Sequence, residues 1–229
     1  MPVMSTDPRW PKLLSLAVHE FRTPITVVAG YLRMVLKERA GPITDQQRKL
    51  LEEGEKSCGR LSALVSEMSD LSGLEGGTAS FNPATVDLSA MLSETAALLP
   101  ELPDREVRVV LEGSGPSMVS GDATRLRTAL TSLLTALRRE VVTSDRLVVR
   151  RSDGNAGGTS TTRLAIGEPD TIDAVAAADP AELEPFDEWR GGSGLSLAIA
   201  RRVIERHGGR LYAPPGRARA GALVVLPRL

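Results

Sequence analysis

The stretch Ser15-Leu16-Ala17-Val18-His19-Glu20-Phe21-Arg22-Thr23-Pro24-Ile25 decides how the first third of the chain folds. It lies within residues 10–39, which we predict to form one long helix, because prolines precede this segment and Ala40-Gly41-Pro42 follows it. The apolar residues of the helix recur every three or four positions, which is typical of a coiled-coil or helical-bundle seam. They are Leu14, Ala17, Phe21, Ile25, Val28, Leu32 and Val35.

A second helix is expected from Thr44, a favourable N-cap, to about Leu74. Its seam follows the same spacing and consists of Leu51, Gly54, Cys58, Leu61, Val65 and Met68. The short connection makes the two helices antiparallel neighbours. Because both apolar faces are too wide for two helices to bury alone, we predict that two copies of the hairpin form a dimeric four-helix bundle.

The rest of the chain mixes helical and strand patterns and is predicted to be an α+β sandwich. Helical periodicity covers residues 88–98, 122–140 and 194–207, whereas strand alternation covers 106–111, 146–151, 161–166, 210–213 and 221–227. Residues 152–155, together with the Ala-Gly-Gly that follows at 156–158, are predicted to be a turn between two strands, and residues 167–190 to be irregular. The predicted organisation is a tail over 1–11, the helical hairpin over 12–74, a linker over 75–82 and a second domain over 83–229.

Composition argues against several classes of protein. The net charge is −1 at pH 7, so nothing indicates nucleic acid or an anionic membrane as a partner. No apolar run approaches the ~20 residues needed to cross a bilayer, and we expect a cytoplasmic protein without a membrane span. The single cysteine, Cys58, precludes an internal disulfide and suits a reducing compartment. With only two histidines, His19 and His207, no metal site is predicted.

His19 is the residue that the helical pattern singles out. At about 100° per residue, the seam lies about 160–240° around the helix from His19, so the imidazole points away from the bundle axis. A core histidine would lie on the seam, and an exposed histidine without a function is the other ordinary interpretation. Glu20 can accept the imidazole N–H and make the ring more nucleophilic. Thr23 lies one turn on, and Pro24 costs about 3 kcal/mol inside a helix, which suggests a local function.

The segment His19–Ile25, His-Glu-Phe-Arg-Thr-Pro-Ile, resembles the H-box of bacterial two-component histidine kinases, usually His-Glu-x-Arg-Thr-Pro-Leu. In that family the box lies in a helical-hairpin domain for dimerisation and phosphotransfer. The resemblance implies that His19 is phosphorylated on a ring nitrogen and that Glu20 assists as acid or base. It also implies that Thr23 could position water for removing a phosphoryl group from a partner aspartate.

Residues 83–229 resemble the catalytic and ATP-binding domain of the same family. The matching pieces are Gly121-Asp122 with Arg125-Leu126, Glu184-Pro185-Phe186, Gly191-Gly192-Ser193-Gly194-Leu195 and Arg206-His207-Gly208-Gly209-Arg210. The family's two asparagines at its magnesium site fall, in an alignment without gaps, on Ser132 and Ala136. The chain contains only two asparagines, Asn82 and Asn155, and neither is placed to serve.

The segment expected to read adenine is also altered. The family has Asp-x-Gly-x-Gly there, whereas this chain has Gly-Glu-Pro-Asp-Thr-Ile over residues 167–172. Glu168 or Asp170 could replace the aspartate, but no second glycine follows and Pro169 stiffens the turn. We therefore expect no cofactor, with binding of ATP and magnesium weak or absent.

The glycine loop is the best-kept part of this second domain. Gly191, Gly192 and Gly194 open a helix and could hold phosphate through backbone N–H groups, as a vestigial phosphate loop. Ser196 stands where the family has a glycine. The alternative is a turn that is retained only for folding.

An uncharged strip extends along the exposed side of the first helix beyond His19. Because phosphoryl transfer needs the partner aspartate in line with the imidazole, we expect a receiver domain to dock within a turn or two of it. The expected contacts are Arg22, Thr26, Val27, Gly30 and Met34. The alternative is that Val27 and Met34 pack on the protein's own second domain.

The sequence leaves three functions open. The favoured one is a phosphorelay histidine phosphotransferase that exchanges a phosphoryl group between His19 and the aspartate of response-regulator receiver domains, including that of a hybrid kinase, without ATP autophosphorylation. The alternatives are an autophosphorylating sensor histidine kinase core and a non-catalytic dimeric scaffold or regulator. Nucleotide binding in the presence of magnesium distinguishes the first two.

Overall fold

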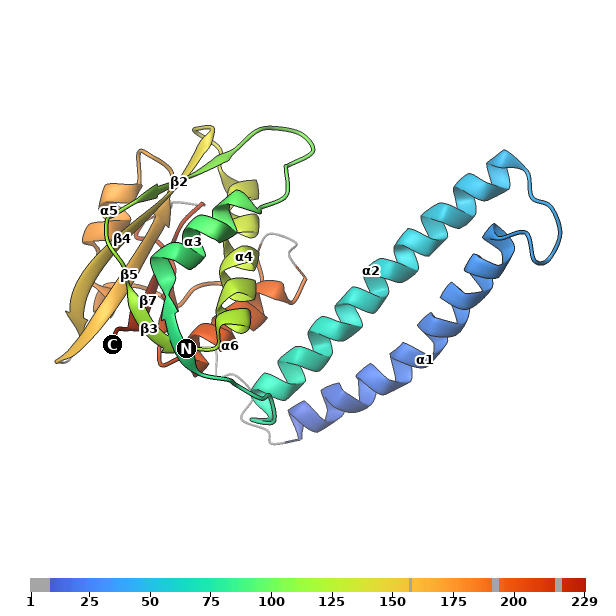
Figure 1. Ribbon diagram of the computed structural model, residues 1–229, viewed down its shortest axis with the longest axis horizontal. Coiled ribbons are helices and arrows are strands. Elements are labelled where there is room, and N and C mark those ends of the chain that lie inside the picture. Colours follow the sequence, from blue (N-terminus) through green and yellow to red (C-terminus); the bar gives the residue numbers. More distant parts are fainter. Residues whose placement is uncertain (1–8, 157, 191–193, 217–219) are drawn as a thin grey trace. The chain divides into compact units, whose positions relative to one another are not determined.

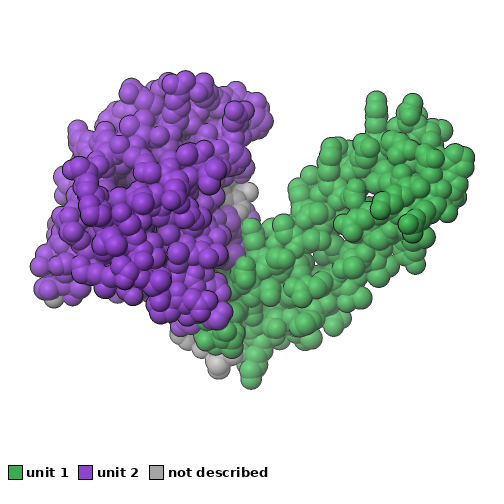
Figure 2. All heavy atoms as spheres, viewed as in Figure 1, with its two compact units in different colours: residues 1–79 green, residues 80–229 purple. Residues whose placement is uncertain are grey.

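The computed structural model describes residues 9–156, 158–190, 194–216 and 220–229. The chain divides into two compact units, residues 1–79 and residues 80–229, coloured separately in Figure 2. The boundary lies inside the segment 75–82 that the sequence marks as a linker. Each unit has its own core and is described by itself.

The first unit is a helical hairpin of α1 (Trp10–Leu36) and α2 (Asp45–Glu75), seen at the right of Figure 1. The N-cap predicted at Thr44 is confirmed: its hydroxyl accepts the N–H of Gln47 at 3.2 Å, and the Gln47 side chain accepts the N–H of Thr44 at 2.8 Å. The first helix is shorter than predicted: α1 ends at Leu36, three residues before the expected end at residue 39. There Glu38 takes a positive φ of 55°, which a continuing helix does not allow.

Only part of each predicted seam is buried inside the hairpin. The seam residues Leu14 of α1 and Cys58 and Val65 of α2 are at most 8% exposed. Val18 and Ala29 of α1 are equally buried, although the predicted seam did not include them. The seam residues Phe21 and Leu61, by contrast, remain 52% and 49% exposed. A single hairpin therefore leaves apolar side chains uncovered on both helices. A second copy of the hairpin would cover them in the predicted dimer.

The second unit is built on a five-stranded sheet with the order β2-β4-β5-β7-β6. The strands are β2 (Arg108–Glu112), β4 (Arg146–Ala156), β5 (Thr159–Gly167), β6 (Arg210–Tyr212) and β7 (Ala222–Pro227). Only β2 and β4 pair in parallel, and the other neighbours are antiparallel. A separate two-stranded sheet joins β1 (Ala84–Asp87) to β3 (Met118–Gly121), and the sequence patterns did not reveal these two short strands.

Helices cover both faces of the larger sheet (Figure 1). The helices α3 (Leu88–Ala97), α4 (Ala123–Glu140) and α6 (Ser196–Arg206) lie together on one side. On the other side α5 (Ile172–Ala177) buries Ile172 and Val175 against Val148, Ala165 and Leu223 of the sheet. This arrangement confirms the predicted fold class, a helical hairpin followed by a sheet domain of α/β type.

Two local predictions were wrong in part. Residues 167–190 are not irregular throughout, since they contain α5 and a single 3-10 turn at Pro180–Glu182. Six helical residues are too few to give a clear periodic signal. The turn predicted over residues 152–158 is shorter than expected, because residues 152–156 belong to β4 and its pairing with β5 continues to Ala156 and Thr159. Gly158, between these two residues, has a positive φ of 85°.

None of the helices in the described ranges is both long enough and apolar enough to cross a bilayer.

Candidate functional site

His19 lies in the first half of α1 with its side chain exposed, as the helical geometry predicts. The neighbouring Val18 is only 2% exposed, and consecutive residues of a helix point about 100° apart, so the two side chains lie on different sides of the helix. Within the described part of the chain, the imidazole has no recorded hydrogen bond or ion pair. Both ring nitrogens are therefore open to a partner from outside the hairpin.

Glu20 and Thr23 are also exposed, on the same stretch of α1. The structure records no hydrogen bond between Glu20 and the imidazole, because consecutive residues of a helix point in directions about 100° apart. Thr23 lies one helical turn from His19, where side chains can meet. The helix continues through Pro24, which cannot donate to the carbonyl of Glu20 four residues earlier.

The five residues predicted to bind a receiver domain lie along the exposed side of α1. Val27 is 49% exposed and Met34 is 46% exposed. No atom lies within 4 Å of the position where a Cβ on Gly30 would be, so the surface is open at that point. The Thr26 hydroxyl donates its proton to the carbonyl of Arg22 at 2.8 Å, so this small side chain has no O–H left to donate to a partner. Apart from Arg22, these residues form an uncharged strip along α1.

In the second unit, Glu168 is buried and bound to the protein's own backbone. Its Oε1 accepts the N–H groups of Val142, Thr143 and Ser144 at 3.0, 2.7 and 3.2 Å, and the Thr143 hydroxyl at 2.8 Å. The carboxylate therefore holds the loop between α4 and β4. The other residue proposed to read adenine, Asp170, is exposed.

The residues that align with the family's asparagines lie on α4. Ala136 is 4% exposed and carries only a methyl group, and Ser132 is half-buried with a single hydroxyl. Neither offers the carbonyl oxygen that an asparagine would give to Mg²⁺. Among the described residues, no group of three or more His, Cys, Asp or Glu side chains is arranged to hold a metal ion.

An ion pair that the sequence did not suggest lies at the C-terminal end of α4. Arg190 Nε is 3.7 Å from Glu140 Oε1, and the Arg190 guanidinium carbon lies 4.1 Å from the ring centre of Phe186. Burial lowers the pKa of Arg190, whereas the carboxylates of Glu140 and Asp187 act in the opposite direction. A cavity of about 470 Å³ adjoins this pair, lined by Arg105, Arg139, Glu140, Val141, Val142 and Arg190. No local pattern could have revealed a contact between residues 50 positions apart.

The predicted phosphate loop is only partly within the described residues. Gly191 and Gly192 lie outside them. Gly194 is exposed and has a positive φ of 61°, two residues before α6 begins at Ser196. A residue with a side chain would be strained in that conformation, which accounts for this one glycine without a ligand.

His207 is the C-cap of α6, at the residue where the predicted helix 194–207 ends. Its Nδ1 lies 2.7 Å from the carbonyl of Val203, and its Nε2 accepts the backbone N–H of Asp122 at 2.9 Å. Since Nε2 accepts, Nδ1 must carry the proton and donate to Val203. The ring thereby joins the end of α6 to the start of α4.

Comparison with known proteins places these features in context. Residues 12–77 match the family model described as the His Kinase A (phospho-acceptor) domain. The circadian input-output histidine kinase CikA of Synechococcus elongatus is 27% identical over 206 residues, covering 87% of this chain and 27% of that protein. The cell-division control histidine kinase PdhS of Brucella ovis is 26% identical, covering 85% of this chain and 20% of that protein. The sensor protein GacS of Pseudomonas syringae is 27% identical, with 84% and 22% covered.

The chain therefore spans roughly a quarter of the length of these curated relatives. Among solved structures, full-length ShkA in complex with AMPPNP has a TM-score of 0.65 at 24% identity, covering 95% of this chain and 46% of that one. The histidine kinase AdeS of Acinetobacter baumannii has a TM-score of 0.54 at 20% identity, covering 92% and 96%. These two similarities support the fold of both units.

Proposed function

Since this chain belongs to the bacterial two-component histidine kinase family, with a phospho-acceptor domain at residues 12–77, we propose that it carries a phosphoryl group on His19. It exchanges this group with the aspartate of response-regulator receiver domains. The observation that carries the proposal is the exposed His19 imidazole on α1, turned away from the buried face of the hairpin and followed by Glu20.

The chemistry follows from that position. A ring nitrogen of His19 attacks the phosphorus of an aspartyl phosphate, the bond from phosphorus to the aspartate oxygen breaks, and the carboxylate leaves with the electron pair. The other ring nitrogen loses its proton to Glu20 once that side chain rotates toward it. The reverse sequence passes the phosphoryl group to a second receiver. The exposed strip beyond His19 holds the partner so that the attack is in line.

We propose that this exchange occurs without autophosphorylation from ATP. Ala136 has no oxygen for magnesium, and Glu168 is held by three backbone N–H groups and a hydroxyl. These bonds occupy Oε1 and hold the carboxylate against the loop between α4 and β4, so only Oε2 is left to accept a hydrogen bond from an adenine amine. The second unit then acts as a structural domain, and the functional form is a homodimer that covers the exposed seam of the hairpin.

The test is a transfer assay with radiolabelled phosphate. The protein is mixed either with a phosphorylated receiver domain or with labelled ATP and magnesium, and an acid-labile label is followed on His19. We expect label only from the receiver, and none in a His19→Gln variant. Label that arrives from ATP alone would overturn the proposal.

The similarity to proteins named as histidine kinases favours one second candidate, an autophosphorylating kinase core. Label on His19 from ATP and magnesium, lost on His19→Gln substitution, would support that candidate. Label from neither source would favour the third function, a dimeric scaffold that binds receivers or kinases without chemistry.

A further inference from the structure

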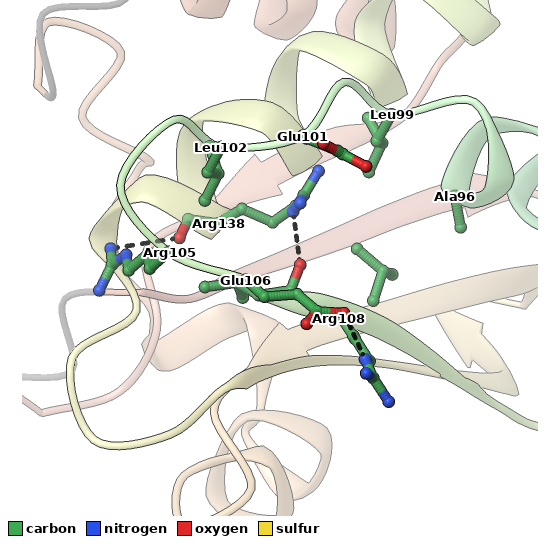
Figure 3. Close-up of a pocket in the computed structure, with 10 residues that line it drawn as sticks. Ala96, Leu99, Glu101, Leu102, Arg105, Glu106, Arg108 and Arg138 are labelled. Carbon is green, nitrogen blue, oxygen red and sulfur yellow. Dashed lines mark hydrogen bonds and ion pairs between the residues drawn. The ribbon is translucent and has the colours of Figure 1, made fainter.

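A second cavity, of about 630 Å³, lies on the second unit between the end of α3, the segment 98–107 and β2 (Figure 3). It shares only Arg105 with the cavity beside Glu140 and contains neither Glu168 nor Ala136. Its size falls in the range of about 300–1,000 Å³ that is usual for small-molecule sites. The lining residues are Ala96, Leu99, Glu101, Leu102, Arg105, Glu106, Val107, Arg108, Val109 and Arg138.

The unusual member of this lining is Arg138. It is only 7% exposed and shares the buried side of α4 with Leu134 and Leu137, each fully buried. Its Nε donates to the carbonyl of Val107 at 3.0 Å and its Nη1 to the carbonyl of Pro100 at 2.9 Å. A guanidinium carries five N–H groups, so these two bonds leave donors that the carbonyls do not use.

The charge of Arg138 has no counter-charge in the described part of the chain. No carboxylate of the described residues forms an ion pair with it, and burial alone lowers its pKa. Two acidic residues line the cavity: Glu106 is paired with Arg108 at 2.8 Å, and Glu101 is exposed and forms no ion pair with Arg138. In Figure 3, Arg138 reaches up toward the segment 98–107 while Arg108 points the opposite way with Glu106. The two carbonyls satisfy part of the guanidinium but do not neutralise it, and a buried charge without a counter-charge is costly. An anionic ligand would supply that counter-charge.

We propose that this cavity binds a small organic anion whose carboxylate or phosphate group is held by Arg138. The planar guanidinium presents parallel donors that match both kinds of oxyanion. Arg105 does not compete for the ligand, because its Nη1 and Nη2 donate to the carbonyls of Val141 and Arg139 at the end of α4. It fixes the segment 98–107 against α4 and so shapes the cavity.

The rest of the lining indicates that the anion carries an apolar body. Five aliphatic residues line the space: Ala96, Leu99, Leu102, Val107 and Val109. Inorganic phosphate would use Arg138 but leave these side chains in contact with water. A ligand with a compact hydrocarbon part covers them, and its binding free energy becomes more favourable in proportion to the apolar surface that is removed from water.

Calorimetric titration of the full chain with three probes tests the proposal: phenyl phosphate, benzoate and inorganic phosphate. We expect saturable binding of phenyl phosphate or benzoate, with the stronger of the two identifying the oxyanion, and at least roughly tenfold weaker binding of inorganic phosphate. Benzylamine has the same apolar ring but a positive charge and should not bind.

Substitution of Arg138 assigns the site. Arg138→Met keeps the length of the side chain without the charge and should weaken binding by roughly tenfold or more. Arg138→Lys keeps the charge without the planar fork, so it gives an intermediate affinity and guards against misfolding of the first variant. Arg108→Met is the matched control, since this arginine lines the cavity but points away, and binding should be unchanged. If the wild type binds no probe, or if both Arg138 variants bind as well as the wild type, Arg138 is only an anchor for the segment 98–107 and the proposal is wrong.

Discussion

The carboxylate oxygen Oε1 of Glu168 accepts the backbone N–H of Thr143 at 2.7 Å. The same oxygen also receives the N–H groups of Val142 and Ser144, so one buried side chain fixes the whole turn between α4 and β4. Three backbone donors would lose their partner if this oxygen were removed.

We therefore predict that Glu168→Ala lowers the free energy of unfolding by about 2–3 kcal/mol, because buried N–H groups without a partner are costly. Chemical denaturation monitored by circular dichroism measures this loss. Asp170→Ala is the matched control, an exposed carboxylate two residues away, and should change stability by no more than about 0.5 kcal/mol. Equal losses in both variants would contradict the structural role of Glu168.

We predict that ATP binds more weakly than about 1 mM in the presence of magnesium, because Ser132 and Ala136 stand where the family's asparagines fall and Oε1 of Glu168 is bound to its own loop. Isothermal titration calorimetry measures the dissociation constant. Ala136→Asn restores a carbonyl oxygen on α4 but leaves Glu168 bound to its loop, so we expect no gain of affinity. A micromolar dissociation constant for the wild type would refute this prediction and promote the kinase alternative.

The hairpin should form a homodimer through the apolar face that α1 and α2 leave exposed. Light scattering should give twice the chain mass of 24.4 kDa. Phe21→Asp and Leu61→Asp place charges on residues that are 52% and 49% exposed, and each should yield folded monomers. Val65→Asp should instead unfold the hairpin, since Val65 is 5% exposed inside it. A wild-type monomer at micromolar concentration would rule out the predicted dimer.

Met34→Asp and Val27→Asp should each slow phosphoryl transfer from a receiver domain by roughly tenfold, the effect of losing one good apolar contact and adding a charge. Rapid-quench measurement of label on His19 gives the rate. The helix and the dimer should persist, because both side chains are about half exposed. Leu98→Asp, at an apolar residue that is 79% exposed in the second unit, is the control. Unchanged rates in both α1 variants would place the receiver elsewhere.

Acid should remove the stabilisation that Asp122 gives to the start of α4. Hydrogen bonds from the N–H groups of Asn82 and Arg125 hold the pKa of this carboxyl below its ordinary value of 3.8. A lowered pKa in the folded state means that the carboxylate stabilises the fold above pH 3.8 and that this contribution is lost as the pH falls through the lower, folded-state value.

The measurable result is a difference between variants. Asp122→Asn should be less stable than the wild type at pH 7, by about 1 kcal/mol for a weakened helix cap. The gap should be constant down to about pH 4 and close below it, in urea unfolding curves taken at each pH. Asp104→Asn, at an exposed carboxylate outside any helix, should show no such convergence. A gap that is independent of pH below 4 would show that the charge of Asp122 contributes nothing.

The helical hairpin could be predicted from the sequence because its determinants are local. The seam spacing, the Thr44 cap and the outward direction of His19 depend on residues within one or two turns of each other. The structure bears out the cap and the exposure of His19, whereas the buried side of α1 includes Val18 and Ala29, which the predicted seam did not contain. The cap of α4 at Asp122 and the position of His207 at the end of α6 follow from equally short-range rules.

Only the tertiary structure decided which side chains are bound by hydrogen bonds or buried within the protein itself. The sequence offered Glu168 as a replacement for an adenine-binding aspartate, but its hydrogen-bond partners lie 24–26 residues away. They become visible only when the loop between α4 and β4 lies beside the end of β5. The burial of Arg138 beside β2, and the division of the hairpin seam into covered and exposed parts, arise in the same way. Helical periodicity reports which residues share a face, whereas the partner of that face depends on how distant segments of the chain pack together.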